Sequence, residues 1–130
     1  MMKNKFLFVL LCSAPHYAYS DCESKPYSLC NVENMPIPKI EFVKLVTTIG
    51  LNLCVDAKSE YNTTKERCES DVLVKTKSCK SEIMNELPDY IDSKDVYKKH
   101  SFKYLNCIAP YFYCKGIEVK NESEAREHCG

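Results

Sequence analysis

Apolar residues recur at helical spacing in three segments of the chain. The first segment begins at Pro38, a residue suited to the first turn of a helix because it has no N–H group to leave unpaired. We predict a central helix from there to just after Cys54. Its apolar stripe consists of Phe42, Leu45, Val46, Ile49 and Leu53, widened by Ile40 and Val43.

The second helical segment opens with a capping box, since Glu66 follows Thr63 by three residues. Pro88 ends this helix, because it disfavours helical geometry in the residue before it. Cys68 and Cys79 lie eleven residues apart, or about 16 Å along a helix, whereas a disulfide needs Cα atoms within about 7 Å. Each therefore bonds to another segment. The predicted buried face carries Cys68, Val72, Cys79, Ile83 and Leu87.

A third helix is predicted from Ser93 to the residue before Pro110. Its periodic positions are Val96, His100, Tyr104, Cys107 and Ile108. Beyond it, Tyr111–Cys114 forms either a helical turn or a strand that Gly116 ends, and Ser123–Cys129 forms a last short helix. The proline-containing segment Cys22–Pro38 is predicted to be an irregular arm.

These elements predict an all-α fold: a small disulfide-stapled bundle of roughly four helices, in one domain over residues 21–130. The chain has only three glycines, and neither Asn-Gly nor Asp-Gly, the strongest hairpin signals, occurs. The sequence therefore disfavours a β-rich fold.

Residues 1–20 have the pattern of a secretory signal peptide. Lys3 and Lys5 precede the apolar run Phe6–Cys12, and Ala18 and Ser20 are the small residues before a cleavage point. The run is shorter than the roughly 20 residues that span a bilayer, and no later segment is apolar enough to anchor the chain. We predict a secreted, extracellular protein without a membrane span. The alternative, a short buried helix of a cytosolic protein, fits the cysteine content less well.

Cleavage removes Cys12 and leaves an even number of cysteines. In an oxidising compartment such a set forms a closed disulfide framework, here of four bridges. No two of these cysteines have the close spacing of a structural zinc site, so we expect no metal and no cofactor. The predicted disulfide cysteines are Cys22, Cys30, Cys54, Cys68, Cys79, Cys107, Cys114 and Cys129.

Charge and sequons add two expectations. Without Lys3 and Lys5, 16 basic residues stand against 18 acidic ones, a net charge of −2. This balance gives no electrostatic footprint for nucleic acid. The sequons Asn62-Thr63-Thr64 and Asn121-Glu122-Ser123 predict N-glycans at Asn62 and Asn121 in a eukaryotic source.

No catalytic residue is predicted. Nucleophilic catalysis needs a nucleophile beside a base, usually a histidine, and the mature chain has only His100 and His128. His100 has the helical spacing of a packed residue, and His128 lies in a last helical turn, where a histidine interacts favourably with the helix C-terminus. A small secreted hydrolase is therefore the lowest-ranked of the functions considered.

An aromatic cluster is the most distinctive feature apart from the cysteines. Its members are Tyr104, Tyr111, Phe112 and Tyr113. Tyrosine offers a large contact area at low entropic cost, so the cluster predicts binding of an extracellular protein or receptor. The same residues can instead fill the core of a domain without tryptophan, and we expect this for at least two of them. A carrier of a small apolar ligand, held in a cavity between helices, is the second-ranked function.

A resemblance can be stated on the cysteine pattern. The run Asn52-Leu53-Cys54, followed by Cys68 and then Lys77-Ser78-Cys79, resembles the middle of a nematode family of secreted cysteine-rich helical domains, and the ending Cys129-Gly130 is similar to theirs. Those domains usually carry more cysteines, in a different early arrangement. The resemblance implies secretion, an all-helical disulfide-linked fold and no assigned catalysis. It supplies no functional residues besides the cysteines.

Overall fold

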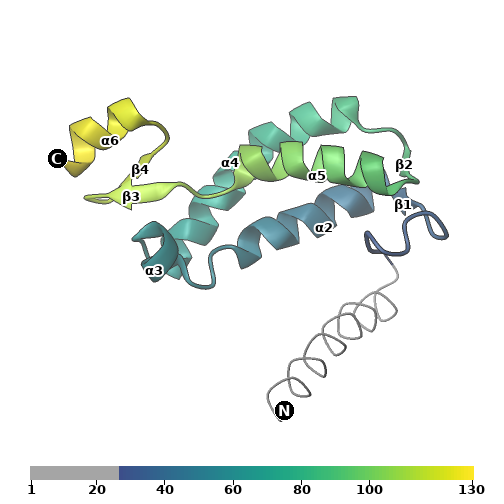
Figure 1. Ribbon diagram of the computed structural model, residues 1–130, viewed down its shortest axis with the longest axis horizontal. Helices are drawn as coiled ribbons and strands as arrows, with labels where there is room; N and C mark the ends of the chain where they lie inside the picture. Colours follow the sequence, from purple (N-terminus) through teal and green to yellow (C-terminus); the bar gives the residue numbers. More distant parts are fainter. Residues whose placement is uncertain (1–26) are drawn as a thin grey trace, which may run out of the picture.

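Three long helices lie side by side in the structure, a computed structural model that describes residues 27–130 (Figure 1). They are α2 (Lys39–Asn52), α4 (Lys65–Glu86) and α5 (Lys94–Ile108), and each packs against the other two. We call these three helices the bundle. The predicted signal peptide and Cys22 lie outside the described residues.

Shorter elements close the two ends of the bundle. At one end β1 (Ile37–Pro38) pairs antiparallel with β2 (Tyr90–Ile91). At the other end lie α3 (Ala57–Tyr61), the antiparallel hairpin of β3 (Phe112–Cys114) and β4 (Ile117–Val119), and α6 (Glu122–Cys129) (Figure 1). The predicted helical, disulfide-linked fold is confirmed. The all-α class is corrected, because the described residues form five helices and two small sheets.

The helix boundaries follow local chemistry. Helix α5 begins next to Ser93, where a helix was predicted to open, and Ser93 is its N-cap because its hydroxyl accepts the Val96 N–H. The cap of α4 is Thr64 and not Thr63: the Thr64 hydroxyl accepts the Arg67 N–H at 3.1 Å. The predicted capping box is therefore displaced by one residue and has no glutamate at its fourth position.

Helix α2 ends at Asn52, earlier than predicted. The N–H of Leu53 bonds the carbonyl of Gly50, three residues back, and the N–H of Cys54 bonds that of Leu51. These tighter bonds wind the last turn of the chain away from α-helical geometry. Cys54 thus lies in a turn, from which its sulfur reaches Cys68 at the start of α4.

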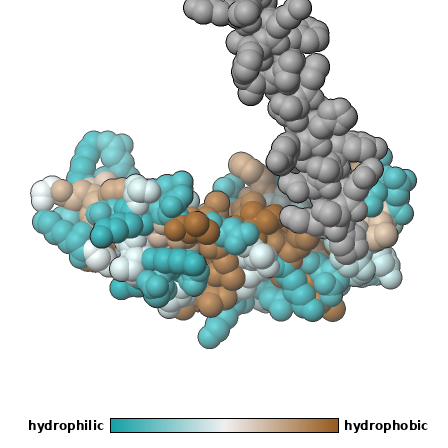
Figure 2. Space-filling model, turned by 90° about the horizontal axis from the view of Figure 1, so that it is seen from below, coloured by the Kyte–Doolittle hydropathy of each residue, from teal (hydrophilic) through white to brown (hydrophobic). Residues whose placement is uncertain are grey.

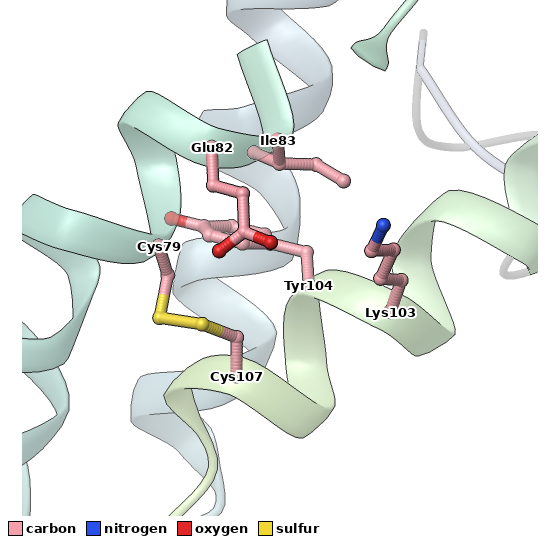
Figure 3. Close-up of a pocket in the computed structure, with 6 residues that line it drawn as sticks. All are labelled: Cys79, Glu82, Ile83, Lys103, Tyr104 and Cys107. Atoms are coloured by element: carbon pink, nitrogen blue, oxygen red, sulfur yellow. A yellow bond between two sulfur atoms is a disulfide. The ribbon is translucent and has the colours of Figure 1, made fainter. Parts of the chain in front are cut away.

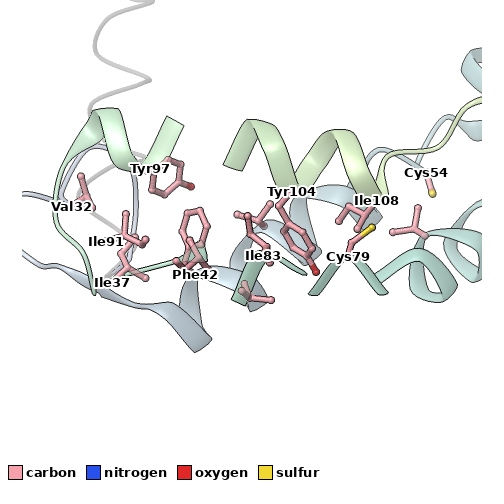
Figure 4. Close-up of a cluster of buried hydrophobic side chains, with 14 of the residues drawn as sticks. Val32, Ile37, Phe42, Cys54, Cys79, Ile83, Ile91, Tyr97, Tyr104 and Ile108 are labelled. Atoms are coloured by element: carbon pink, nitrogen blue, oxygen red, sulfur yellow. The ribbon is translucent and has the colours of Figure 1, made fainter. Parts of the chain in front are cut away.

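One continuous apolar cluster runs along the bundle (Figure 4). It begins at the β1–β2 end with Val32, Ile37 and Ile91 and continues through Phe42, which meets the ring of Tyr97 edge-to-face at 5.3 Å. The further members are Val43, Val46, Cys54, Ala57, Cys68, Val72, Cys79, Ile83, Leu87, Tyr104 and Ile108. The predicted α4 face, Cys68 to Leu87, is buried throughout, which confirms that assignment.

Gly50 allows α2 to lie close to the end of α5. A Cβ atom at this position would lie 2.6 Å from Cδ1 of Ile108, well inside van der Waals contact. A larger residue would require the Ile108 side chain to shift, in a site whose other neighbour is Val72.

Three disulfides are present among the described residues. Cys54–Cys68 joins the turn after α2 to α4, Cys79–Cys107 joins α4 to α5, and Cys114–Cys129 joins β3 to α6. The deduction that Cys68 and Cys79 bond to different segments is confirmed. Cys30 is disulfide-bonded as well.

Candidate binding surface

The hairpin of β3 and β4 turns on two residues with positive φ. Lys115 has φ 52° and Gly116 has φ 81°, the pattern of a type I′ turn, whose twist matches that of the paired strands. We call residues 111–130, with β3, β4 and α6, the C-terminal unit. In Figure 1 it lies at the end of the bundle next to α3.

The two faces of the hairpin contact different helices. Tyr113 lies opposite Glu118, and both point to one face, because side chains alternate along a strand. Phe112 and Cys114, opposite Val119 and Ile117, point to the other face. On that face α6 packs over the strands and is bonded to them through Cys114–Cys129.

A polar network attaches the first face to α4. Three α4 side chains spaced one turn apart, Arg67, Asp71 and Lys75, meet Tyr113 and Glu118. We call these five residues the polar network. The Tyr113 hydroxyl contacts the carboxylates of both Asp71 and Glu118, the second at 3.0 Å. The Arg67 Nε donates to Asp71 at 3.1 Å, and Lys75 forms an ion pair with Glu118.

Burial and charge together shift the pKa values of this network. Burial raises the pKa of the Tyr113 phenol, and its contacts with the two carboxylates raise it further, so the hydroxyl stays protonated. Burial alone would raise the pKa of Asp71, but hydrogen bonds from Tyr113 and Arg67 outweigh it and leave this pKa below its ordinary value. The network therefore holds Asp71 as a carboxylate at neutral pH.

Three large apolar side chains of the hairpin region remain exposed. Tyr111, Phe112 and Ile117 are 39%, 49% and 46% exposed, and we call them the hairpin surface. Phe112 and Ile117 lie on the face next to α6, and Tyr111 lies on the side of α4. The Lys75 ammonium lies 5.0 Å from the centre of the Tyr111 ring and also donates to the Ala109 carbonyl at 3.0 Å. This cation–π contact fixes the ring without burying it.

The structure divides the predicted aromatic cluster. Tyr111 and Phe112 are exposed, whereas Tyr104 and Tyr113 are each only 1% exposed. The Tyr104 hydroxyl bonds Thr47 at 2.8 Å inside the bundle. We therefore remove Tyr104 and Tyr113 from the candidate surface, because their side chains do not reach solvent. Ile117 was missed by the sequence analysis, which did not recognise the strand that carries it.

The two histidines of the predicted mature chain lie in different surroundings. His100 is buried on α5, its Nδ1 has no hydrogen-bond partner among the described residues, and burial followed by the charge of Lys99 lowers its pKa. His128 is half-buried in the last turn of α6, 4.0 Å from Glu127. Within residues 27–130, no group of three histidine, cysteine or acidic side chains is placed to hold a metal ion.

Two hollows on the described part of the protein differ from the cavity of a small-molecule carrier. The first lies between α4 and α5 beside the Cys79–Cys107 bridge, with Glu82 and Lys103 at its edges (Figure 3), and has a volume of about 50 Å³. The second, beside α3, has about 350 Å³ but is open, and its lining includes Asp56, Lys58 and Lys65. Neither is the enclosed apolar cavity of several hundred Å³ that a small-molecule carrier uses.

A second apolar area lies on the face of the molecule formed by α2. Figure 2 shows hydrophobic residues in the middle of this face. Ile40 and Ile49 are the exposed large apolar residues of α2. This helix also presents Lys44, Thr48 and Asn52 to solvent, so the apolar residues here are interrupted by polar ones.

Comparisons with known proteins add no assignment: no protein-family model matches the chain, and no curated protein or solved structure matches it. The resemblance to the nematode domains therefore stays a prediction. No helix of residues 27–130 is long and apolar enough to cross a membrane. The three disulfides are consistent with an oxidising, extracellular location.

Proposed function

We propose that this protein is a secreted binding protein that captures an extracellular protein or receptor through the hairpin surface, without catalysing a reaction. One observation carries the proposal: Phe112 and Ile117 are exposed on one face of a hairpin that is held on both faces, and Tyr111 is exposed next to the hairpin, beside Lys75 of α4. Interface cores favour aromatic residues, and a rigid support lowers the entropic cost of binding.

The support for this rigidity comes from opposite sides of the hairpin. The polar network fixes one face to α4, and the Cys114–Cys129 disulfide fixes the other to α6. The Asn62 side chain adds a third attachment, because its amide donates to the Tyr113 carbonyl at 2.9 Å. A hairpin held in this way presents its exposed side chains in one arrangement.

Phe102 provides a matched control for the test. It is 70% exposed on α5, so it is at least as accessible as Phe112 but belongs to the bundle. The photoreactive residue p-benzoylphenylalanine is introduced at Phe112 or at Phe102, and each protein is irradiated in the fluid into which the protein is secreted. We expect a discrete covalent adduct from position 112 and none from position 102.

Competition shows whether the adduct is specific. Unlabelled wild-type protein and the Phe102→Ser variant should suppress the adduct, whereas a Phe112→Ser/Ile117→Ser variant of unchanged melting temperature should not. Adducts from position 102 alone would contradict the proposed surface. A turnover-dependent activity that is lost on replacing His100 would contradict the non-enzymatic function.

A further inference from the structure

The two sequons lie in different settings, although Asn62 and Asn121 are both exposed. An N-glycan is attached to the side-chain nitrogen, Nδ2. The question is therefore what that nitrogen does in the folded protein, and the answer differs between the two residues.

Asn121 uses only its amide oxygen. It is the N-cap of α6, and its Oδ1 accepts the Glu124 N–H at 2.9 Å. The Glu124 carboxylate in turn accepts the Lys120 N–H at 2.8 Å. The Asn121 Nδ2 makes no hydrogen bond to any described residue. A sugar on this nitrogen therefore leaves the helix cap intact and extends into solvent.

Asn62 uses its nitrogen. It ends α3 in the left-handed conformation, with φ 58°, and its Nδ2 donates to the Tyr113 carbonyl at 2.9 Å. This bond links residues 51 positions apart and joins α3 to β3. A sugar on Nδ2 replaces one of the two N–H hydrogens, so the bond to Tyr113 survives only when the hydrogen that donates to this carbonyl is the one that remains.

From this contrast we propose that Asn121 carries an N-glycan in the folded, secreted protein and that Asn62 does not. The amide Nδ2 of Asn121 attacks C1 of an oligosaccharide carried on a polyprenyl diphosphate. The Nδ2–C1 bond forms and the C1–O bond to the diphosphate breaks. The diphosphate leaves with the electron pair, and Nδ2 loses one proton. The inference rests on the proposed function only in requiring that the chain enters a eukaryotic secretory pathway.

Two substitutions remove the sequons and keep both asparagines. Ser123→Ala removes the acceptor hydroxyl of the Asn121 sequon and leaves the α6 cap in place. Thr64→Asp removes that of the Asn62 sequon, and aspartate is as good an N-cap as threonine, so the start of α4 is preserved. Neither variant changes the hairpin surface.

The protein is expressed in a eukaryotic secretory cell line in two forms, one with the full chain as it stands and one with a heterologous signal peptide in place of residues 1–20. Protein collected from the medium is treated with peptide N-glycosidase in H₂¹⁸O, which marks each glycosylated asparagine as labelled aspartate. We expect label at Asn121 only, complete loss of label in Ser123→Ala, and no change in Thr64→Asp.

The outcomes separate the two proposals. Label at Asn62 in the fully oxidised secreted protein, or no label at Asn121 in the form with the heterologous signal peptide, overturns the glycan assignment. Secretion of that form alone contradicts the predicted signal peptide and with it the proposed secreted function. The glycan assignment is then decided by the secreted form.

Discussion

The bundle buries a continuous apolar cluster, whereas the buried residues of the C-terminal unit are Tyr113, Cys114 and Val119. Helix α6 has no buried residue at all. This unit is attached through the polar network and disulfide-bonded within itself. Apolar burial depends little on salt and pH, whereas ion pairs and hydrogen-bonded carboxylates depend on both. The proposed binding surface therefore lies on the region that solution conditions disturb first.

Phe42→Ala should have the largest effect and should destabilise both regions. Phe42 is fully buried at the centre of the apolar cluster, and truncating such a residue costs about 3–5 kcal/mol. This is a large part of the 5–15 kcal/mol typical of a folded domain. Urea unfolding followed by circular dichroism measures the loss. Phe102→Ala, on the surface, should change the free energy of unfolding by less than about 0.5 kcal/mol, and equal effects of the two would contradict a bundle held by its core.

Replacing both Cys114 and Cys129 by serine should disorder the C-terminal unit alone. This bridge spans 15 residues, for which the chain-entropy account gives about 3 kcal/mol. Amide hydrogen exchange should show lost protection in β3, β4 and α6 and unchanged protection in α4 and α5. The matched variant replaces both Cys54 and Cys68 by serine. It removes a disulfide whose sulfurs lie in the core, so the bundle should lose stability instead. Global unfolding on loss of Cys114–Cys129 would remove the distinction between the regions.

Tyr113→Phe should loosen the attachment of the hairpin by about 1.5–3 kcal/mol, the range for hydrogen bonds to charged groups. The ring and its packing are kept, and only the hydroxyl that contacts Asp71 and Glu118 is lost. Local opening free energies from hydrogen exchange in β3 and β4 report the change. Tyr111→Phe is the control, because the structure gives the Tyr111 hydroxyl no partner among the described residues. An effect of similar size from both variants would count against the network.

The smallest predicted effect is on pH dependence: the two regions should lose stability in different pH ranges. The lowered pKa of His100 means that the unfolded chain takes up its proton first, so the bundle loses stability as pH falls below the ordinary value of 6.5. The lowered pKa of Asp71 contributes stability that is present above its ordinary value of 3.8 and is lost as pH falls through the folded value. Denaturant unfolding of the bundle between pH 8 and pH 5 measures the contribution of His100. Amide hydrogen exchange of the hairpin below pH 5 measures the contribution of Asp71.

Variants assign each window. His100→Leu should flatten the first response and Asp71→Asn the second. The groups around His100 include Glu86, which raises its pKa, and Lys99 and Lys103, which lower it. A bundle response at pH 5–7 that persists in His100→Leu would show that another group titrates there.

The sequence predicts the bundle far better than the C-terminal unit. Long apolar repeats place α4 and α5 almost to the residue, and Tyr104 has the helical spacing of the buried positions around it. The hairpin was missed because its turn is Lys115-Gly116, in which lysine takes the positive φ expected of asparagine or aspartate. Helix α3 has five residues and no periodicity to detect.

One part of the polar network is visible in the sequence of α4. Arg67, Asp71 and Lys75 alternate in charge at one-turn spacing along α4, a pattern that indicates a charged face. Its partners Tyr113 and Glu118 follow 42 and 43 residues after their α4 contacts. Local pattern does not specify pairing over such a distance, so the separation of Tyr111 from Tyr113 in exposure could be established only from the fold.

Amide hydrogen exchange of the wild-type protein, resolved by residue and repeated at about 0.05 and 1 M NaCl, tests the central contrast most directly. We predict that β3, β4 and α6 exchange through an opening of lower free energy than α4 and α5, and that added salt lowers the first free energy while leaving the second unchanged. A single opening free energy shared by both regions, with the same response to salt, would contradict a binding surface docked by a polar network on an apolar bundle.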